Sequence, residues 1–367
     1  MALFELVAGG LLMISFLYCF VFVDEKGKGY MAMGKRLLYK KIPAACKSAI
    51  EKVPGGSTLV WFLERSQRYI CFEANPAIQF FYLALAVGGY YLYVVYGFQH
   101  VPNSYLDEYH KYVAWPFMGA CYWSYYKACG TNPGYLKDTE RSTLERAAKR
   151  YPYDDIMFSS KAWCDTCAIP KPARSKHCAL CNMCCEKFDH HCVWINNCVG
   201  LHNYKYFVLF LVLHLGICLY GLVVGYFCAL HLIDEGDLWN KVFYDRQGNK
   251  FRANWQIILQ YLQSEYEMFS IVVFLCGIVT IMLFLFIAFH SYLIWKDMTT
   301  NEFSKRQMIQ RFLEGRLSFL EKWEKARTDK KAFRPNKKAI EKHGISGDLS
   351  LDLSTEDLVE RRELTKQ

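Results

Sequence analysis

The side chains that could bind a metal or act as a nucleophile concentrate in one 35-residue stretch, Cys164–Cys198. It reads CDTCAIPKPARSKHCALCNMCCEKFDHHCVWINNC and holds eight of the chain's sixteen cysteines. Cysteine thiolate and imidazole are the usual ligands of structural zinc, and thiolate is also a common protein nucleophile. The number of ligands that zinc would take therefore decides which side chains remain for chemistry.

One spacing, C-x2-C-x9-H-x6-C, occurs twice in this stretch, displaced by fourteen residues. Each copy supplies three thiolates and one imidazole, the ligand set of a closed tetrahedral zinc site. The neighbours His177 and Cys178 belong to different copies, and in extended chain their side chains point to opposite faces. The sequence therefore predicts two interleaved structural zinc sites. The first comprises Cys164, Cys167, His177 and Cys184, and the second comprises Cys178, Cys181, His191 and Cys198.

Four side chains remain after this assignment: Cys185, Asp189, His190 and Cys192. If His191 faces its zinc, the same alternation places His190 and Cys192 together on the other face. A neighbouring imidazole activates a thiol, and a carboxylate can orient that imidazole. We therefore expect Cys192 as nucleophile, His190 as base and Asp189 as its orienting partner. The alternatives are that His190 and Cys192 belong to a third metal site or only support the ligands; Cys185 has no assigned role.

The elements that must position these residues are long apolar runs in a chain that is 53% apolar and 17% aromatic. The runs approach or exceed the ~20 residues that cross a bilayer core. They lie at 3–23, 77–98, 112–129, 205–233 and 270–295. The first could instead be a signal peptide, although its apolar stretch is long and no basic residue precedes it. The expected fold class is an all-α integral membrane bundle of about five transmembrane helices with a small Cys-rich domain.

The distribution of charge orients these helices. Segment 24–75 carries ten Lys and Arg and segment 130–205 carries eleven, whereas loop 98–111 carries one and loop 234–269 four against six acidic residues. Basic loops remain cytosolic, so the Cys-rich domain and the C-terminal tail are expected in the cytosol. There, crowded cysteines favour metal or catalysis over disulfides. The net charge of +9 then reflects the basic loops on the cytosolic side, which also attract the anionic headgroups of the lipid bilayer. Nucleic acid is not an expected partner.

These patterns divide the chain into eight segments. Segment 24–75 is a cytosolic basic amphipathic segment, either an interfacial helix or a plain tether. The others are a first transmembrane helix (1–23), transmembrane helices 2 and 3 (76–129), the cytosolic Cys-rich zinc domain (130–204), transmembrane helix 4 (205–233), a lumenal loop (234–269), transmembrane helix 5 (270–295) and a cytosolic tail (296–367).

The position of Cys192 indicates a class of substrate. It precedes the span that begins near Lys205 by thirteen residues, so its thiol is expected at the cytosolic membrane face. An electrophile with a polar head and an apolar chain, such as long-chain acyl-CoA, suits that depth. The thiol would form an acyl-enzyme, and a protein thiol would then take the acyl group. One rival is a membrane-anchored zinc-finger adaptor without catalysis, and another is a transporter, although the spans hold few ionisable residues.

The segment 160–203 resembles the DHHC-type protein S-acyltransferases (palmitoyltransferases). The resemblance rests on KPARSKHC, on the tetrapeptide DHHC at Asp189–Cys192 and on NNCVG, and it extends to TTNE at Thr299–Glu302, which is similar to the family's TTxE motif. It implies two structural Zn²⁺ ions, palmitoyl-CoA as co-substrate and an acylated Cys192. It also implies protein substrates with membrane-proximal cysteines, an acyl cavity between helices, and an endoplasmic reticulum or Golgi membrane.

The resemblance also implies roles for residues outside the tetrapeptide. Thr300 would pack near Asp189, and Trp194 and Asn203 would help to shape the active site. One position departs from the pattern, because many members have proline after the catalytic cysteine, where this chain has Val193. Proline fixes φ, so the backbone after the thiol is less constrained here, which puts the rate in doubt.

Overall fold

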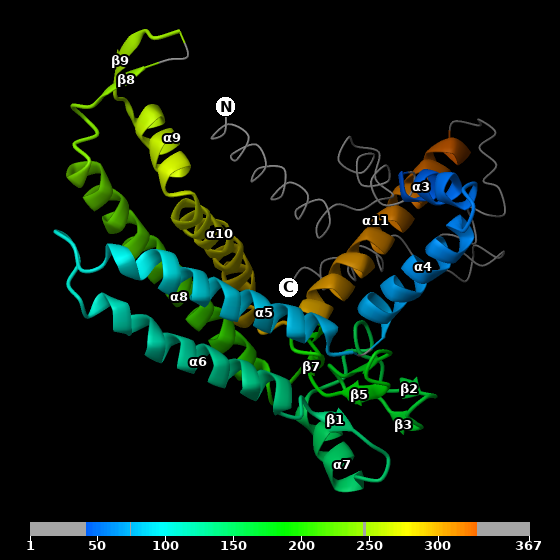
Figure 1. Cartoon of the computed structure of the whole chain (residues 1–367). Helices are drawn as coiled ribbons and strands as arrows, with labels where there is room; N and C mark the ends of the chain where they lie inside the picture. The colour runs from blue at the N-terminus through cyan, green and yellow to red at the C-terminus, as the bar shows by residue number, and fades with distance from the viewer. Residues whose placement is uncertain (1–41, 74, 245–246, 329–367) are drawn as a thin grey trace. The chain divides into compact units, whose positions relative to one another are not determined.

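The computed structural model describes residues 42–73, 75–244 and 247–328 (Figure 1). The chain divides into two compact units. Among the described residues, the helical unit comprises those up to Asn132 together with His191–Asn197 and His202–Ala288, and the Cys-rich unit comprises Pro133–His190, Cys198–Leu201 and the residues from Phe289 to Thr328. The first predicted span, 3–23, and the tail beyond 328 lie outside the described residues.

Most of the helical unit consists of long helices. They are α3 (Ile42–Glu51), α4 (Gly56–Phe72), α5 (Ala77–Leu92), α6 (His110–Gly130), α8 (Tyr204–Glu235), α9 (Trp255–Glu265) and α10 (Glu267–Trp295), and α5 continues through a π-helical turn (Tyr93–Gly97) and a 3₁₀ turn (Phe98–His100). Three helical segments of the described chain are long and apolar enough to cross a membrane: Ala77–His100, Tyr204–Glu235 and Glu267–Trp295. They coincide with the predicted spans at 77–98, 205–233 and 270–295.

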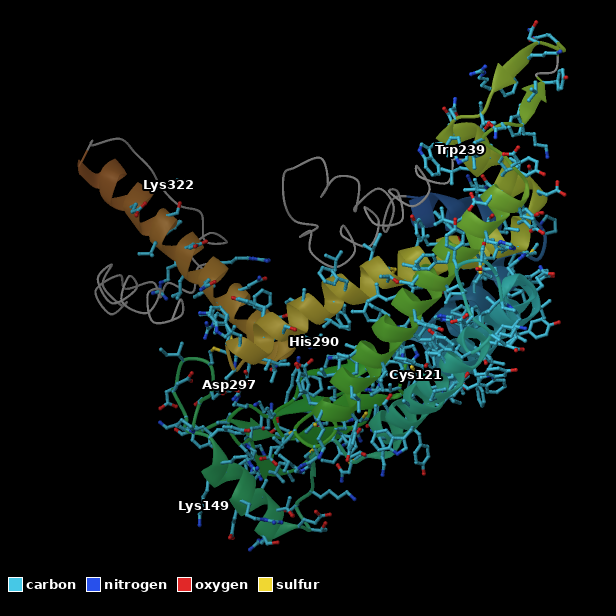
Figure 2. All side chains as sticks on the ribbon, turned by 90° about the vertical axis from the view of Figure 1, so that its left-hand side faces the viewer. Cys121, Lys149, Trp239, His290, Asp297 and Lys322 are labelled. Carbon is cyan, nitrogen blue, oxygen red and sulfur yellow. The ribbon has the colours of Figure 1, made fainter. Side chains whose placement is uncertain are left out.

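The predicted span at 112–129 forms helix α6, but α6 is not among the three segments apolar enough to cross a membrane. Its polar and aromatic side chains and the internal Pro116 lower its hydropathy. It nevertheless packs along α8 (Figure 1). The ring of Phe117 on α6 lies close to Gly216 on α8, where a Cβ would come within 3.3 Å of a ring carbon. Cys121, labelled in Figure 2, is almost fully buried on α6. The prediction of about five transmembrane helices is therefore supported for three.

Aromatic rings connect three helices of this unit. The ring centroid of Tyr82 on α5 lies 4.5 Å from that of Tyr125 on α6 and 5.6 Å from that of Phe210 on α8. The rings of Tyr125 and Phe210 are themselves 5.5 Å apart. Such tilted and edge-to-face pairs stabilise packing beyond the apolar area that they bury. Tyr125 thus has a fixed position in the interior of the unit.

The segment predicted as a loop at 234–269 contains regular structure. A hairpin pairs β8 (Val242–Tyr244) with β9 (Lys250–Arg252), and helix α9 follows it. The side chain of Asn254 accepts a hydrogen bond from the backbone N–H of Ile257 at 3.0 Å and so caps α9. This segment was predicted only as a lumenal loop, and the hairpin and the helix within it were not predicted from the sequence.

The other elements are short strands and two helices, most of them in the Cys-rich unit, while β6 and β7 each belong partly to both units. These are β1 (Tyr135–Leu136), α7 (Arg141–Arg150), β2 (Trp163–Cys164), β3 (Ile169–Pro170), β4 (Lys176–Cys178), β5 (Met183–Cys185), β6 (His190–Cys192), β7 (Asn197–Val199) and α11 (Thr300–Thr328). The strands form one three-stranded sheet in the order β1-β5-β4 and the pairs β2-β3 and β6-β7. Each C-x2-C pair is followed by a residue with left-handed backbone, Ala168 (φ 52°) or Asn182 (φ 52°), which turns the chain back.

Cysteines occupy positions that apolar side chains would fill in a larger domain. One buried cluster contains Cys164 and Cys184 with Leu136 and Ile169, and another contains Cys178, Cys185 and Cys198 with Phe188. Domains with so small an apolar core usually depend on disulfides or metal for stability. The strands alone are too short to hold this fold.

Candidate active site and metal centres

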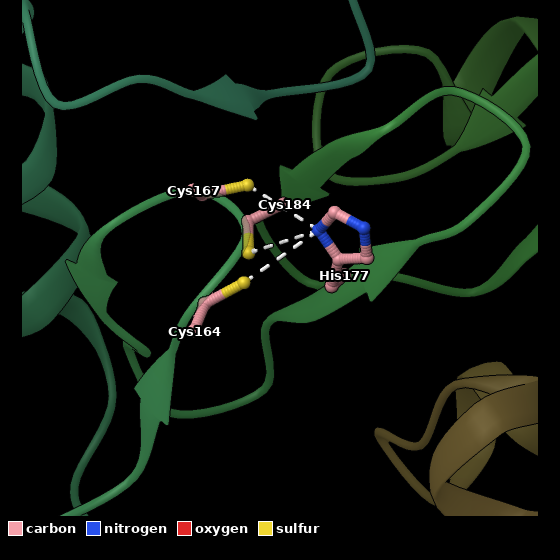
Figure 3. Close-up of side chains that lie close together, drawn as sticks. All are labelled: Cys164, Cys167, His177 and Cys184. Atoms are coloured by element: carbon pink, nitrogen blue, oxygen red, sulfur yellow. Dashed lines mark hydrogen bonds between the residues drawn. The ribbon is translucent and has the colours of Figure 1, made fainter.

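The structure brings the first predicted ligand set together (Figure 3). The Nδ1 atom of His177 lies 3.6 Å from the Sγ of Cys164, 3.3 Å from that of Cys167 and 3.9 Å from that of Cys184. A tetrahedral zinc with bonds of roughly 2.3 Å to sulfur and 2.0–2.1 Å to nitrogen requires sulfur–nitrogen separations of about 3.6 Å. Antiparallel pairing of β4 with β5 places His177 opposite Cys184. The donor set and its spacing therefore fit zinc.

The second set, Cys178, Cys181, His191 and Cys198, also places its four ligand atoms within 4.8 Å of one another. The sulfur atoms of Cys181 and Cys198 are 3.5 Å apart. The hydroxyl of Tyr135 donates to the Sγ of Cys181 at 3.1 Å, a contact of the kind that orients metal ligands and stabilises thiolate charge. Among the described residues, these two sets are the groups of His, Cys, Asp and Glu that could hold a metal ion.

Asp189 and His190 form a closely bonded pair. The Nδ1 of His190 lies 2.6 Å from the Oδ2 of Asp189, and since a carboxylate only accepts, Nδ1 carries the proton. The other ring nitrogen, Nε2, is then the atom that can accept a proton. Thr300 donates to the same carboxylate from its backbone N–H at 2.7 Å and from its hydroxyl at 2.8 Å. Asp189 is 2% exposed, so these contacts are shielded from water.

The environment of Asp189 determines its charge. Burial alone would raise the pKa of this carboxyl, but the hydrogen bonds from His190 and Thr300 hold the pKa below its ordinary value. The stabilisation that ionised Asp189 gives the folded protein is fully present above the ordinary carboxyl pKa. It is lost as the pH falls through the lowered pKa. Asp189 therefore remains ionised near neutral pH and can stabilise a protonated His190.

The TTNE sequence forms the start of helix α11. The backbone N–H of Thr299 donates to Oε2 of Glu302 at 2.9 Å, and the backbone N–H of Glu302 donates to the hydroxyl of Thr299 at 3.2 Å. These reciprocal bonds are a capping box, which satisfies N–H groups that the first turn leaves without helical partners. The N–H of Thr300 is thereby aimed at Asp189 from the positive end of the helix dipole.

Arg174 links this helix start to the Cys-rich strands. Its Nε and Nη2 donate to the two carboxylate oxygens of Glu302, each at 2.7 Å, and its Nη1 donates to Asp297 at 3.1 Å. Asp297, labelled in Figure 2, also binds Lys187. The pairing of Arg174 with Glu302 was not predicted from the sequence. The T-x-x-E spacing signals the capping box, but no sequence signal identifies Arg174 as its partner.

Cys192 lies outside both ligand sets and is 7% exposed. In strand β6 the first and third side chains, those of His190 and Cys192, point to one face and that of His191 to the other.

Asn203 is fully buried, and its side-chain amide donates to the backbone carbonyl of Ala128 at 3.1 Å, near the C-terminus of α6. It thereby satisfies a carbonyl that the last helical turn leaves without a partner. Burial raises the pKa of the Cys185 thiol, which favours its neutral form and a packing role.

These features define a class of protein: a chain with membrane-length helices and a Cys-rich domain able to bind two metal ions. Residues 157–307 match the sequence model of the DHHC palmitoyltransferase family. The chain therefore carries a DHHC palmitoyltransferase domain, and the resemblance to this family is confirmed.

Curated proteins of similar sequence carry the same description. Palmitoyltransferase swf1 of Schizosaccharomyces pombe is 34% identical over 259 residues, which are 69% of this chain and 65% of that protein. Palmitoyltransferase ZDHHC4 of Mus musculus is 36% identical over 181 residues, 48% of this chain and 51% of that protein. Palmitoyltransferase SWF1 of Saccharomyces cerevisiae is 33% identical over 172 residues, 47% and 43% of the two chains. The chain thus spans less than two thirds of the length of each of these relatives.

Proposed function

We propose that this protein is a protein S-acyltransferase that moves a long-chain acyl group, chiefly palmitoyl, from acyl-CoA to cysteines of protein substrates. The observation that carries the proposal is the hydrogen bond between Asp189 and His190, at 2.6 Å, in the strand that also holds Cys192, a thiol that neither ligand set uses. An oriented imidazole next to a free cysteine is the arrangement that activates a thiol nucleophile. The family match over residues 157–307 supports the same chemistry.

The reaction proceeds in two transfers. First, His190 accepts the proton of Cys192, whose sulfur attacks the thioester carbonyl carbon of acyl-CoA. The bond from that carbon to the sulfur of CoA breaks, and CoA leaves with the proton from His190. Second, His190 accepts the proton of a substrate cysteine, whose sulfur attacks the acyl carbon, and Cys192 leaves and is reprotonated. Asp189, held by Thr300, keeps Nδ1 of His190 protonated and stabilises its positive charge in both transfers.

The finer assignments belong to the same proposal. Each ligand set would hold one structural zinc ion with four protein ligands, which leaves no open position for water. The zinc ions stabilise the domain and take no part in the transfers. Cys192 would face the cytosol at the membrane surface of an endoplasmic reticulum or Golgi protein with about five transmembrane helices. The substrates would be proteins with membrane-proximal cysteines, and Trp194 and Asn203 would shape the site.

The alternative is a membrane-anchored zinc-finger adaptor that performs no chemistry. Such a protein would need the two ligand sets but would gain nothing from the hydrogen bonds that His190 and Thr300 make with Asp189. The two functions differ in one measurable property, the transfer of an acyl group onto the protein itself.

The deciding experiment incubates the detergent-purified wild type and Cys192→Ser with labelled palmitoyl-CoA and measures zinc in both. We expect a hydroxylamine-sensitive label on the wild type and none on Cys192→Ser, with equal zinc contents, because Cys192 is no ligand. A folded, zinc-containing wild type that takes no label would contradict the acyltransferase and favour the adaptor. Equal loss of zinc and folding in both Cys192→Ser and Cys178→Ser would contradict the separation of nucleophile and ligands.

Thr300 offers a second test of the proposed site. Thr300→Val removes the hydroxyl that donates to Asp189 at 2.8 Å. Hydrogen bonds to charged groups contribute about 1.5–3 kcal/mol, so the rate of acyl-enzyme formation should fall by roughly tenfold or more. Thr300→Ser keeps the hydroxyl and should retain most of the rate. Equal rates for Thr300→Val and Thr300→Ser in a single-turnover labelling assay would show that this contact has no role in catalysis.

A further inference from the structure

The backbone that follows Cys192 is held by side chains from two helices of its own unit. The hydroxyl of Tyr125, on α6, donates to the backbone carbonyl of Trp194 at 3.0 Å. The Nε2 of Gln79, on α5, donates to the next carbonyl, that of Ile195, at 3.1 Å. Tyr125 is 7% exposed, so its bond lies in an environment where few water molecules compete. Two successive carbonyls thus have fixed donors from residues far away in the sequence.

The same segment forms a tight turn. The backbone N–H of Ile195 donates to the carbonyl of Cys192 at 3.2 Å, and that of Asn196 donates to the carbonyl of Val193 at 3.3 Å. Val193 therefore occupies the second position of the turn Cys192–Ile195, where proline is the favoured residue because its ring fixes φ. Valine leaves that dihedral free to vary. The shape of the turn then depends more on contacts from outside it.

The far end of the segment is fixed as well. The side-chain amide of Asn197 donates to the carbonyls of Cys129, at 2.9 Å, and Thr131, at 3.2 Å, where α6 ends. Asn197 thereby satisfies carbonyls that the last helical turn leaves without partners. With Asn197 holding one end, Gln79 and Tyr125 are the contacts that control the turn nearest the thiol.

We infer that Gln79 and Tyr125 are positioning residues that hold Cys192 in its reactive geometry, in place of the constraint that a proline at position 193 would supply. This inference rests on the proposed acyl transfer at Cys192. Neither side chain is placed among the reacting groups; both act through the backbone of Trp194 and Ile195. Small displacements of a reacting atom reduce rate strongly, because catalysis depends on near-attack geometry.

The first test compares single-turnover acyl-enzyme formation in Tyr125→Phe and Gln79→Met over a range of palmitoyl-CoA concentrations. Tyr125→Phe keeps the ring that packs with Tyr82 and removes only the donor. We expect the maximal rate to fall roughly fivefold to tenfold in each variant, with the half-saturating concentration unchanged. The matched controls are Tyr126→Phe, on α6, and Gln99→Met, in the 3₁₀ turn that continues α5, and both side chains are exposed. Both controls should react at the wild-type rate.

The second test adds Val193→Pro to each slow variant. Val193 is 37% exposed, so its replacement disturbs little packing. Proline should restore most of the wild-type rate, because it fixes the turn that the lost hydrogen bond had held. A purely structural loss in the helices would not respond to a change in the turn.

The outcomes distinguish the inference from the function on which it rests. If the wild type takes no label, the proposed acyl transfer is wrong and the inference fails with it. If the wild type is labelled and Tyr125→Phe and Gln79→Met react as fast, the inference alone is overturned. Slow variants that Val193→Pro does not restore also overturn it, because the side chains then support packing and not the turn.

Discussion

Cys184→Ser is expected to lower the zinc content from two ions per chain to one or none and to unfold the Cys-rich domain. Cys184 is fully buried, and in the β4–β5 pair it lies opposite His177, a second ligand of the same set. Structural zinc contributes about 10–16 kcal/mol to folding in small domains, as much as or more than the ~5–15 kcal/mol that a whole domain retains. The surrounding strands are two or three residues long and cannot replace that contribution.

The matched control is Cys185→Ala, at the adjacent and equally buried cysteine. Cys185 belongs to neither ligand set, so this variant should keep both zinc ions and lose only packing. Metal analysis of the purified proteins and limited proteolysis of the domain measure the two effects. A Cys184→Ser protein with full zinc and wild-type protease resistance would contradict a metal-stabilised domain. So would zinc loss in Cys185→Ala alone.

Arg174→Met is expected to destabilise the Cys-rich unit by about 3–5 kcal/mol, because it leaves the buried carboxylate of Glu302 without its cation. The side chains of Arg174 and Glu302 are 10% and 4% exposed, and two bonds of 2.7 Å join them. Since Glu302 caps α11, the same change should disturb Thr300 and slow acyl-enzyme formation. Denaturant unfolding in detergent and single-turnover labelling measure the two effects.

Two further variants identify the cause of this loss. Lys187→Met removes a cation from Asp297, whose side chain is 76% exposed, and should cost at most about 1 kcal/mol. The double variant Arg174→Met/Glu302→Gln has no uncompensated charge and keeps an oxygen for the N–H of Thr299. It should therefore be more stable than Arg174→Met. If Arg174→Met is no less stable than Lys187→Met, the buried ion pair does not support the unit.

Local spacing in the sequence was sufficient to predict both metal-ligand sets. The repeated C-x2-C-x9-H-x6-C pattern identifies the ligands directly, because a C-x2-C pair forms a tight turn that brings its two thiols together. The separation of His190 and Cys192 from His191 follows from the alternation of a strand. Three membrane-length helices were predictable for a similar reason, since an apolar run of sufficient length has few other stable environments.

The sequence was less informative where an element is neither strongly apolar nor periodic. The run at 112–129 became a helix without reaching membrane-spanning hydropathy, and the hairpin and helix within 234–269 were not predicted. In both segments polar and aromatic residues are mixed. The local pattern is then compatible with more than one structure, and packing decides among them.

The sequence by itself determined which side chains could bind metal and which thiol remained, because those assignments depend on residues close together along the chain. Only the tertiary structure decided what holds them in place. Arg174 meets Glu302 across 128 residues and Gln79 meets Ile195 across 116, whereas the contact of Thr300 with Asp189, across 111, was expected only from the family resemblance. No local rule encodes such pairs, since each partner is chosen by the packing of whole helices and strands.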